Sequence, residues 1–108
     1  MDTYDSRLPR TFGALSDPTR LAVVGRLVNG PASVSQLSQP FQMARPSFLK
    51  HLRILEGAGL VTSAKAGRVR TVTLAPEALR WVEDWVQDHR ARLENRLDRL
   101  DSFLAQEQ

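Results

Sequence analysis

The final part of the 108-residue sequence, from Pro76 to Leu104, has the pattern of one long amphipathic helix. Its apolar residues recur at intervals of three or four, the near-heptad spacing of a helix-pairing seam, and Trp81 and Trp85 widen the stripe near its start. A domain of this size can cover the Trp81 end but not the whole stripe, so we expect a symmetric partner to cover the distal part. The predicted interface residues in this helix are Leu79, Val82, Val86, His89, Leu93, Leu97, Leu100 and Leu104.

Length and composition favour a single domain that spans residues 1–108. Hydrophobic residues make up 42% of the chain, and no apolar run is long enough to cross a bilayer. The N-terminal segment MDTYDSRLPR lacks the apolar core of a secretory signal, so we expect a cytoplasmic protein with no membrane partner. The absence of cysteine excludes disulfides, thiol redox sensing and thiolate metal sites.

The net charge of +3 is distributed unevenly along the chain. Residues 44–75 carry six basic side chains and one acid, whereas residues 76–108 carry five arginines and eight acids. A basic middle followed by an acidic tail indicates that one part of the molecule approaches a polyanion. Taken alone, the basic stretch is equally consistent with a solvated charged surface.

The sequence predicts three short helices before residue 40, two of them marked by capping residues. The first is expected over residues 9–15, and it carries Phe12. The second begins after the N-cap Asp17 and ends near Gly30, and a third, capped by Ser33, follows with two apolar residues turned inward. The positions of the second helix that we predict to face the core are Leu21, Val24, Leu27 and Val28.

The stretch RPSFLKHLRILEG, residues 45–57, predicts a helix with two chemically different faces. At 100° per residue, the face predicted to be buried consists of Phe48, Leu52 and Leu55. Lys50 and Arg53 fall on the opposite, exposed face, and Gly57 or Gly59 is expected to end the helix with a positive φ. Such a helix can pack by one side and lie in a groove by the other.

Two β-rich runs over residues 61–74, separated by KAG, predict a hairpin. Strand alternation is expected to place Arg68 and Arg70 on the same side of the second strand, from which both can reach a phosphate backbone. Taken alone, these charges are better explained as protection of an exposed sheet edge. The adjacent basic helix is what favours the phosphate contact.

The sequence offers little for catalysis or metal binding. It contains no glycine-rich phosphate loop, nucleophile elbow or clustered carboxylate pair. His51 and His89 are isolated, and only a pairing of His89 and Asp88 with symmetry-related copies would bring several ligands together. We therefore expect no enzyme, no bound metal and no other cofactor.

At this point the order of elements and three motifs, LSDPTRL, KHLRILEGAGLV and GRVRTVTL, resemble the ArsR/SmtB family of winged helix-turn-helix transcription regulators. The resemblance spans residues 8–104, and the tail WVQDHRARLENRLDRLDSFL is similar to a metal-independent branch of that family. It implies a mainly α fold with a small β-hairpin wing, in which four helices precede the hairpin and one follows it, and it implies a dimer.

In that family the helix that matches residues 45–57 enters the major groove of double-stranded DNA, and the hairpin wing, residues 61–74 here, touches the backbone or the minor groove. The first and last helices form the dimer interface, which adds Phe12 to the residues above. Residues 8–75 are thus expected to bind DNA and residues 76–104 to dimerise. The expected DNA contacts are Arg45, Ser47, Leu49, Lys50 and Arg53 in the helix and Lys65, Arg68 and Arg70 in the wing.

Two positions depart from the family pattern, since many relatives carry serine where this chain has Ala44 and Leu49. Leu49 could instead meet a thymine methyl group, with Ser47 supplying a hydroxyl from the neighbouring turn. We expect a repressor that binds an inverted-repeat operator; its small-molecule effector, if it has one, is unknown. The alternative is a winged-helix module that docks an acidic protein without binding DNA. Basic residues on both the helix and the wing favour DNA.

Overall fold

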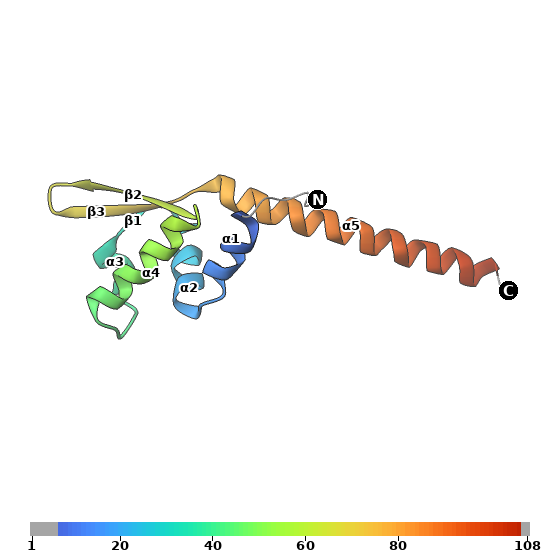
Figure 1. The fold of residues 1–108 in the computed structure, drawn as a ribbon, viewed down its shortest axis with the longest axis horizontal. Coiled ribbons are helices and arrows are strands. Elements are labelled where there is room, and N and C mark those ends of the chain that lie inside the picture. The colour runs from blue at the N-terminus through green and yellow to red at the C-terminus, as the bar shows by residue number, and fades with distance from the viewer. Residues whose placement is uncertain (1–6, 107–108) are drawn as a thin grey trace.

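The computed structural model describes residues 7–106, which form five α-helices and three β-strands (Figure 1). In chain order these are α1 (Arg7–Leu15), α2 (Pro18–Leu27), β1 (Ala32–Ser33), α3 (Val34–Ser38), α4 (Arg45–Gly57), β2 (Val61–Ala66), β3 (Val69–Leu74) and α5 (Pro76–Gln106). The N-terminal segment considered above as a secretory signal lies partly outside the described residues. Among the helices of residues 7–106, none is long and apolar enough to cross a membrane.

Helix α2 begins where the capping signal predicts. The side chain of Asp17 accepts hydrogen bonds from the backbone N–H groups of Thr19, at 2.9 Å, and Arg20, at 3.1 Å. Pro18 occupies the first turn, where its missing N–H would have no helical partner. Gly30 follows the helix with a φ of 129°, a conformation that favours glycine.

The predicted core face of α2 is wrong at two positions. Val24 and Leu27 are buried as predicted, but the side chains of Leu21 and Val28 are 56% and 65% exposed. Val23 was not among the predicted core positions, yet its side chain is only 1% exposed. Helices α1 and α4 both pack on α2 and cover the side that includes Val23. The other edge of the apolar stripe, with Leu21 and Val28, faces solvent.

A two-residue strand, β1, lies between α2 and α3 and was not predicted. It pairs antiparallel with β3, Ala32 opposite Val72 and Ser33 opposite Thr71, so the hairpin becomes a sheet with the order β1-β3-β2. Ser33 also caps α3 as predicted. Its hydroxyl accepts from the N–H of Gln36 at 3.1 Å, and the Gln36 side chain accepts from the N–H of Ser33 at 2.9 Å, which makes a complete capping box.

The buried face of α4 is the one that the sequence predicts. Phe48, Leu52 and Leu55 all lie in the core cluster, and the Phe48 ring stacks on Phe41 with ring centroids 5.7 Å apart. The helix ends at Gly57, and Gly59, which follows the C-cap Ala58, has a φ of 76°. The N–H groups of Gly59 and Leu60 donate to the carbonyl oxygens of Glu56 and Leu55, each at 3.0 Å, in the pattern of a Schellman motif.

Helix α5 packs on the domain only at its start and then projects away from it, while the β2–β3 hairpin extends from the opposite end (Figure 1). Ala78 is fully buried, Arg7 lies over the Trp81 ring at 4.2 Å, and Phe12 meets Trp85 edge-on at 5.4 Å. Farther along, five large apolar side chains are between 51% and 57% exposed: Leu93, Leu97, Leu100, Phe103 and Leu104. The chain's own core therefore covers only the Trp81 end, as predicted.

Candidate nucleic-acid interface

One side of α4 presents basic and polar side chains to solvent. Arg45, Ser47, Lys50 and Arg53 are all exposed, and the buried face of the same helix fixes the direction in which they point. Leu49 differs, because it is half-buried and packs against the core. Only part of the Leu49 side chain is therefore available to a thymine methyl group.

The N-terminus of α4 lacks a side-chain cap. Ala44 occupies the N-cap position with extended backbone angles, and no side chain accepts a hydrogen bond from the first turn. The first N–H groups of a helix need an acceptor, and the helix dipole makes this end attractive to anions. A DNA phosphate can supply the acceptor that a serine at position 44 would otherwise provide.

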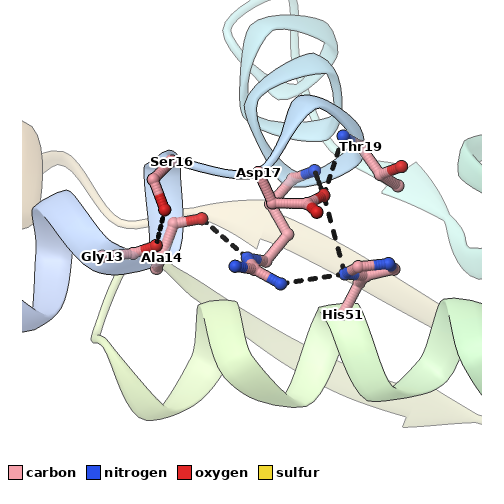
Figure 2. A network of polar contacts seen from close by, with 7 residues as sticks. Gly13, Ala14, Ser16, Asp17, Thr19 and His51 are labelled. Carbon is pink, nitrogen blue, oxygen red and sulfur yellow. Dashed lines mark hydrogen bonds and ion pairs between the residues drawn. The ribbon is translucent and has the colours of Figure 1, made fainter.

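Arg20, which is not among the expected DNA contacts, joins the α1–α2 corner to α4. Its Nε donates to the carbonyl oxygen of Ala14 at 2.7 Å, and its Nη1 lies 3.0 Å from Nδ1 of His51 (Figure 2). Arginine only donates, so Nδ1 of His51 accepts, and the neutral ring then carries its proton on Nε2. In the sequence, this contact could have been suspected only from the position of Arg20 in the first turn of α2, three residues after the N-cap Asp17.

Asp17 lies next to this contact. Its Oδ2 is 3.8 Å from Nδ1 of His51, and Figure 2 shows the carboxylate between the start of α2 and the imidazole. The hydrogen bond from the Arg20 backbone N–H is the main cause that lowers the pKa of Asp17 below its ordinary value of 3.8. Partial burial of the carboxylate acts in the opposite direction and raises the pKa.

The wing carries two positive charges that face each other. In the β2–β3 register Lys65 is directly opposite Arg70, and both side chains are exposed. Like charges at directly opposed positions of an antiparallel pair destabilise it. The arrangement becomes favourable next to a polyanion, which neutralises both charges.

Arg68 does not lie in a strand, so the predicted alternation with Arg70 is wrong. Ala66 pairs with Val69, which leaves Gly67 and Arg68 as a two-residue turn. Gly67 has a φ of 62°, as tight hairpin turns of this length require. Arg68 is thus exposed at the tip of the wing, and its direction is set by the turn rather than by β3.

A chain of hydrogen bonds connects the wing to the end of α4. The guanidinium of Arg70 donates to the hydroxyl of Ser63 at 3.0 Å, and that hydroxyl donates to Oε1 of Glu56 at 2.9 Å. Sequence reasoning missed this connection, because Glu56 and Ser63 belong to different elements. It couples the position of Arg70 to that of α4.

The candidate histidine of α5 is engaged within the chain. Nδ1 of His89 lies 2.8 Å from the Trp85 carbonyl oxygen, which can only accept, and the two rings stack at 4.1 Å. Asp88 pairs with Arg92 at 2.6 Å. Across residues 7–106, no group of three or more histidine, aspartate or glutamate side chains is arranged to hold a metal ion.

Comparison with known proteins adds independent evidence. A family profile described as a helix-turn-helix domain matches residues 15–64. The chain is 40% identical over 79 residues to the HTH-type transcriptional regulator Rv2034 of Mycobacterium tuberculosis, and the match covers 73% of each protein. It is 25% identical over 79 residues to the transcriptional repressor SdpR of Bacillus subtilis, covering 69% of this chain and 88% of that repressor.

Two solved structures share the fold along most of its length. A crystal structure of the ArsR family transcriptional regulator RHA00566 has a TM-score of 0.81 and 47% identity, and the match covers 87% of this chain and 97% of that one. An ArsR-like transcriptional regulator from Rhodococcus sp. RHA1 has a TM-score of 0.75 and 28% identity, covering 91% and 92%. The chain therefore belongs to the ArsR family of winged helix-turn-helix proteins, which are DNA-binding transcription regulators and not enzymes.

Proposed function

We propose that this protein is a repressor that binds an inverted-repeat operator as a homodimer in the cytoplasm. The observation that carries the proposal is the set of exposed basic side chains on two adjoining elements, Lys50 and Arg53 on α4 and the opposed pair Lys65 and Arg70 on the wing. A repressor named SdpR is among its relatives, and occupation of a promoter by a bound dimer is the simplest way to repress.

The two basic elements contact different parts of the DNA. Lys50 and Arg53 lie in the major groove and contact base edges, while Arg45 and Ser47 contact the backbone at the start of α4. The wing residues Lys65, Arg68 and Arg70 contact phosphates or the minor groove. Residues 8–75 bind one half-site in this way, and Leu49 adds an apolar contact with the part of its side chain that is exposed.

Dimerisation is assigned to residues 76–104 together with Phe12 of α1. The distal apolar side chains of α5 are exposed within one chain, so a second copy has a continuous surface to cover. A two-fold dimer presents two α4 helices to two successive half-sites, which matches an inverted repeat. We propose no metal or other cofactor for this activity, since His51 and His89 lie on different elements and each is engaged within its own chain.

Selection of bound fragments from a genomic library by the purified protein tests the proposal. We expect a recurrent inverted repeat upstream of genes, and we expect Lys50→Ala to lose it. Arg99→Ala, a basic residue on the distal, solvent-exposed part of α5, serves as the matched control and should select the same sites. If the protein enriches no sequence but binds acidic proteins, it is an interaction module and the proposal is wrong.

A further inference from the structure

The two faces of the β2–β3 hairpin differ in charge. The strand register places Ser63, Lys65 and Arg70 on one face, together with Val61 and Val72, which are buried in the core cluster. The residues of the other face are all uncharged: Thr62, Ala64, Ala66, Val69, Thr71 and Thr73. Because β2 packs against α4, both charges of the strands lie on the side of the wing that faces α4.

The side chain of Arg70 is directed back along the wing toward α4. Ser63 pairs with Val72, so Arg70 is its diagonal neighbour in the sheet. Nη1 of Arg70 donates to the Ser63 hydroxyl at 3.0 Å, and this hydroxyl donates to Oε1 of Glu56 at 2.9 Å. A hydroxyl has a single hydrogen, and since Glu56 accepts it, the oxygen lone pairs of Ser63 remain free to accept from Arg70. The Glu56 carboxylate thus sets the direction of both hydrogen bonds.

This link leaves Arg70 able to bind a phosphate. A guanidinium has several N–H donors, and the link uses a donor of Nη1 only, on a side chain that is exposed. A long, exposed side chain loses rotamer freedom when it binds, and this loss weakens a complex. Because the link restricts Arg70 before DNA arrives, less freedom is lost on binding.

Glu56 is an unfavourable residue for a surface that binds a polyanion. It is the only acid among residues 44–75, and its negative charge repels DNA. Both hydrogen bonds of the link lie at the exposed surface, where side chains contribute little to the free energy of unfolding. Neither the charge of Glu56 nor its effect on stability explains an acid here. Its position as the acceptor for Ser63 does.

We infer that Glu56 and Ser63 are positioning residues that hold Arg70 on the α4 side of the wing, ready for a phosphate of the duplex that α4 reads. The inference rests on the proposed operator binding and adds two residues that act through Arg70. It gives Glu56 two opposite effects on affinity. Its charge weakens DNA binding, whereas its hydrogen bond to Ser63 strengthens it.

Two substitutions of Glu56 separate these effects in operator titrations at one salt concentration. Glu56→Ala removes the charge and the acceptor, and it should weaken operator binding about threefold. Glu56→Gln removes the charge but keeps an oxygen that accepts from Ser63, so it should bind at least as tightly as the wild type. Ser63→Ala should weaken binding about fivefold, and Thr62→Ala, on the uncharged face, should leave it unchanged.

An Arg70→Ala background tests whether both residues act through Arg70. In this background Ser63→Ala should cause no further loss of affinity, and Glu56→Ala should strengthen binding because only its charge still matters. The free protein provides a second readout. Nitrogen relaxation of the Arg70 Nε–H group should show a more mobile side chain in Glu56→Ala and Ser63→Ala than in Glu56→Gln, while all three unfold at the wild-type temperature.

The contrary results have distinct meanings. Tighter operator binding by Glu56→Ala in the wild-type background would show that only the charge of Glu56 matters and would overturn the inference. Equal losses with and without Arg70 would also overturn it, since Glu56 and Ser63 would then act elsewhere. In both cases a wild type that prefers its operator over a scrambled duplex keeps the proposed function. A wild type without that preference would overturn the proposed function and the inference together.

Discussion

Nη1 of Arg20 in α2 donates a hydrogen bond to Nδ1 of His51 in α4 across 3.0 Å. The same guanidinium donates from Nε to the carbonyl oxygen of Ala14 at the end of α1, so one side chain joins three helices (Figure 2). His51 directly follows Lys50, which lies on the exposed face of α4. The contact therefore fixes the rotation at which α4 presents its basic face.

Arg20→Lys should weaken operator binding about fivefold and lower the free energy of unfolding by about 1–2 kcal/mol. Lysine keeps the positive charge but cannot donate to Ala14 and His51 with the fixed geometry of a guanidinium. Operator titration and urea unfolding measure the two effects. The control is Arg26→Lys in the same helix, because the Arg26 guanidinium makes a longer, 3.4 Å hydrogen bond to the Gly30 carbonyl at the exposed surface. Equal behaviour of the two variants would contradict a positioning role for Arg20.

Lys65→Thr should affect stability and DNA binding in opposite directions. Removing one of two opposed charges relieves the repulsion with Arg70 and should stabilise the free protein by about 0.2–1 kcal/mol. The same change removes a phosphate contact, so the slope of log K against log salt should become shallower by about 0.9. Thermal unfolding and binding titrations at several salt concentrations measure these effects. A loss of stability, or an unchanged slope, would mean that Lys65 does not face the DNA backbone.

Arg53→Ala and Arg68→Ala should differ in what they change. Arg53 lies on the exposed face of α4, and its loss should relax sequence preference at one operator position at a cost of about 1–3 kcal/mol. Arg68 lies at the tip of the wing, and its loss should weaken all duplexes nearly equally. Competition binding with single-base operator variants separates the two effects. Normal binding by Arg53→Ala would show that the recognition face is placed incorrectly.

Asp17→Asn should flatten the acid limb of the stability profile. The pKa of Asp17 in the folded protein is lowered, chiefly by the backbone N–H of Arg20. The ionised group therefore stabilises the fold above its unfolded-state pKa, and this contribution is lost as the pH falls through the lowered folded-state pKa, below about pH 4. Asparagine keeps the cap but does not titrate. Urea unfolding between pH 6 and pH 3 measures the difference, and Asp98→Asn on distal α5 should keep the wild-type slope.

Local sequence patterns predicted the elements whose causes are local. The caps at Asp17 and Ser33, the stop at Gly59 and the buried face centred on Phe48 all follow from side chains and backbone within one helix. The prediction of a mainly α winged helix-turn-helix fold is confirmed by the elements observed and by the similarity to ArsR family structures. These features required no knowledge of distant contacts.

The features that sequence reasoning missed depend on residues far apart in the chain. The bond between Arg20 and His51 joins positions 31 residues apart. Strand β1 is two residues long, too short for any periodicity, and forms only because β3 lies beside it. Leu21 and Val28 were predicted to be buried because the apolar stripe of α2 is wider than the side that α1 and α4 cover.

The salt dependence and stoichiometry of binding to a selected operator test the central claim most directly. Sedimentation of the complex gives the number of chains per duplex, and titrations from low to moderate salt give the slope of log K against log salt. The account predicts two chains per inverted repeat, a slope of about −0.9 for each phosphate contact, and a clear preference for the operator over a scrambled duplex. A salt-insensitive complex, or equal affinity for the operator and the scrambled duplex at moderate salt, would contradict it.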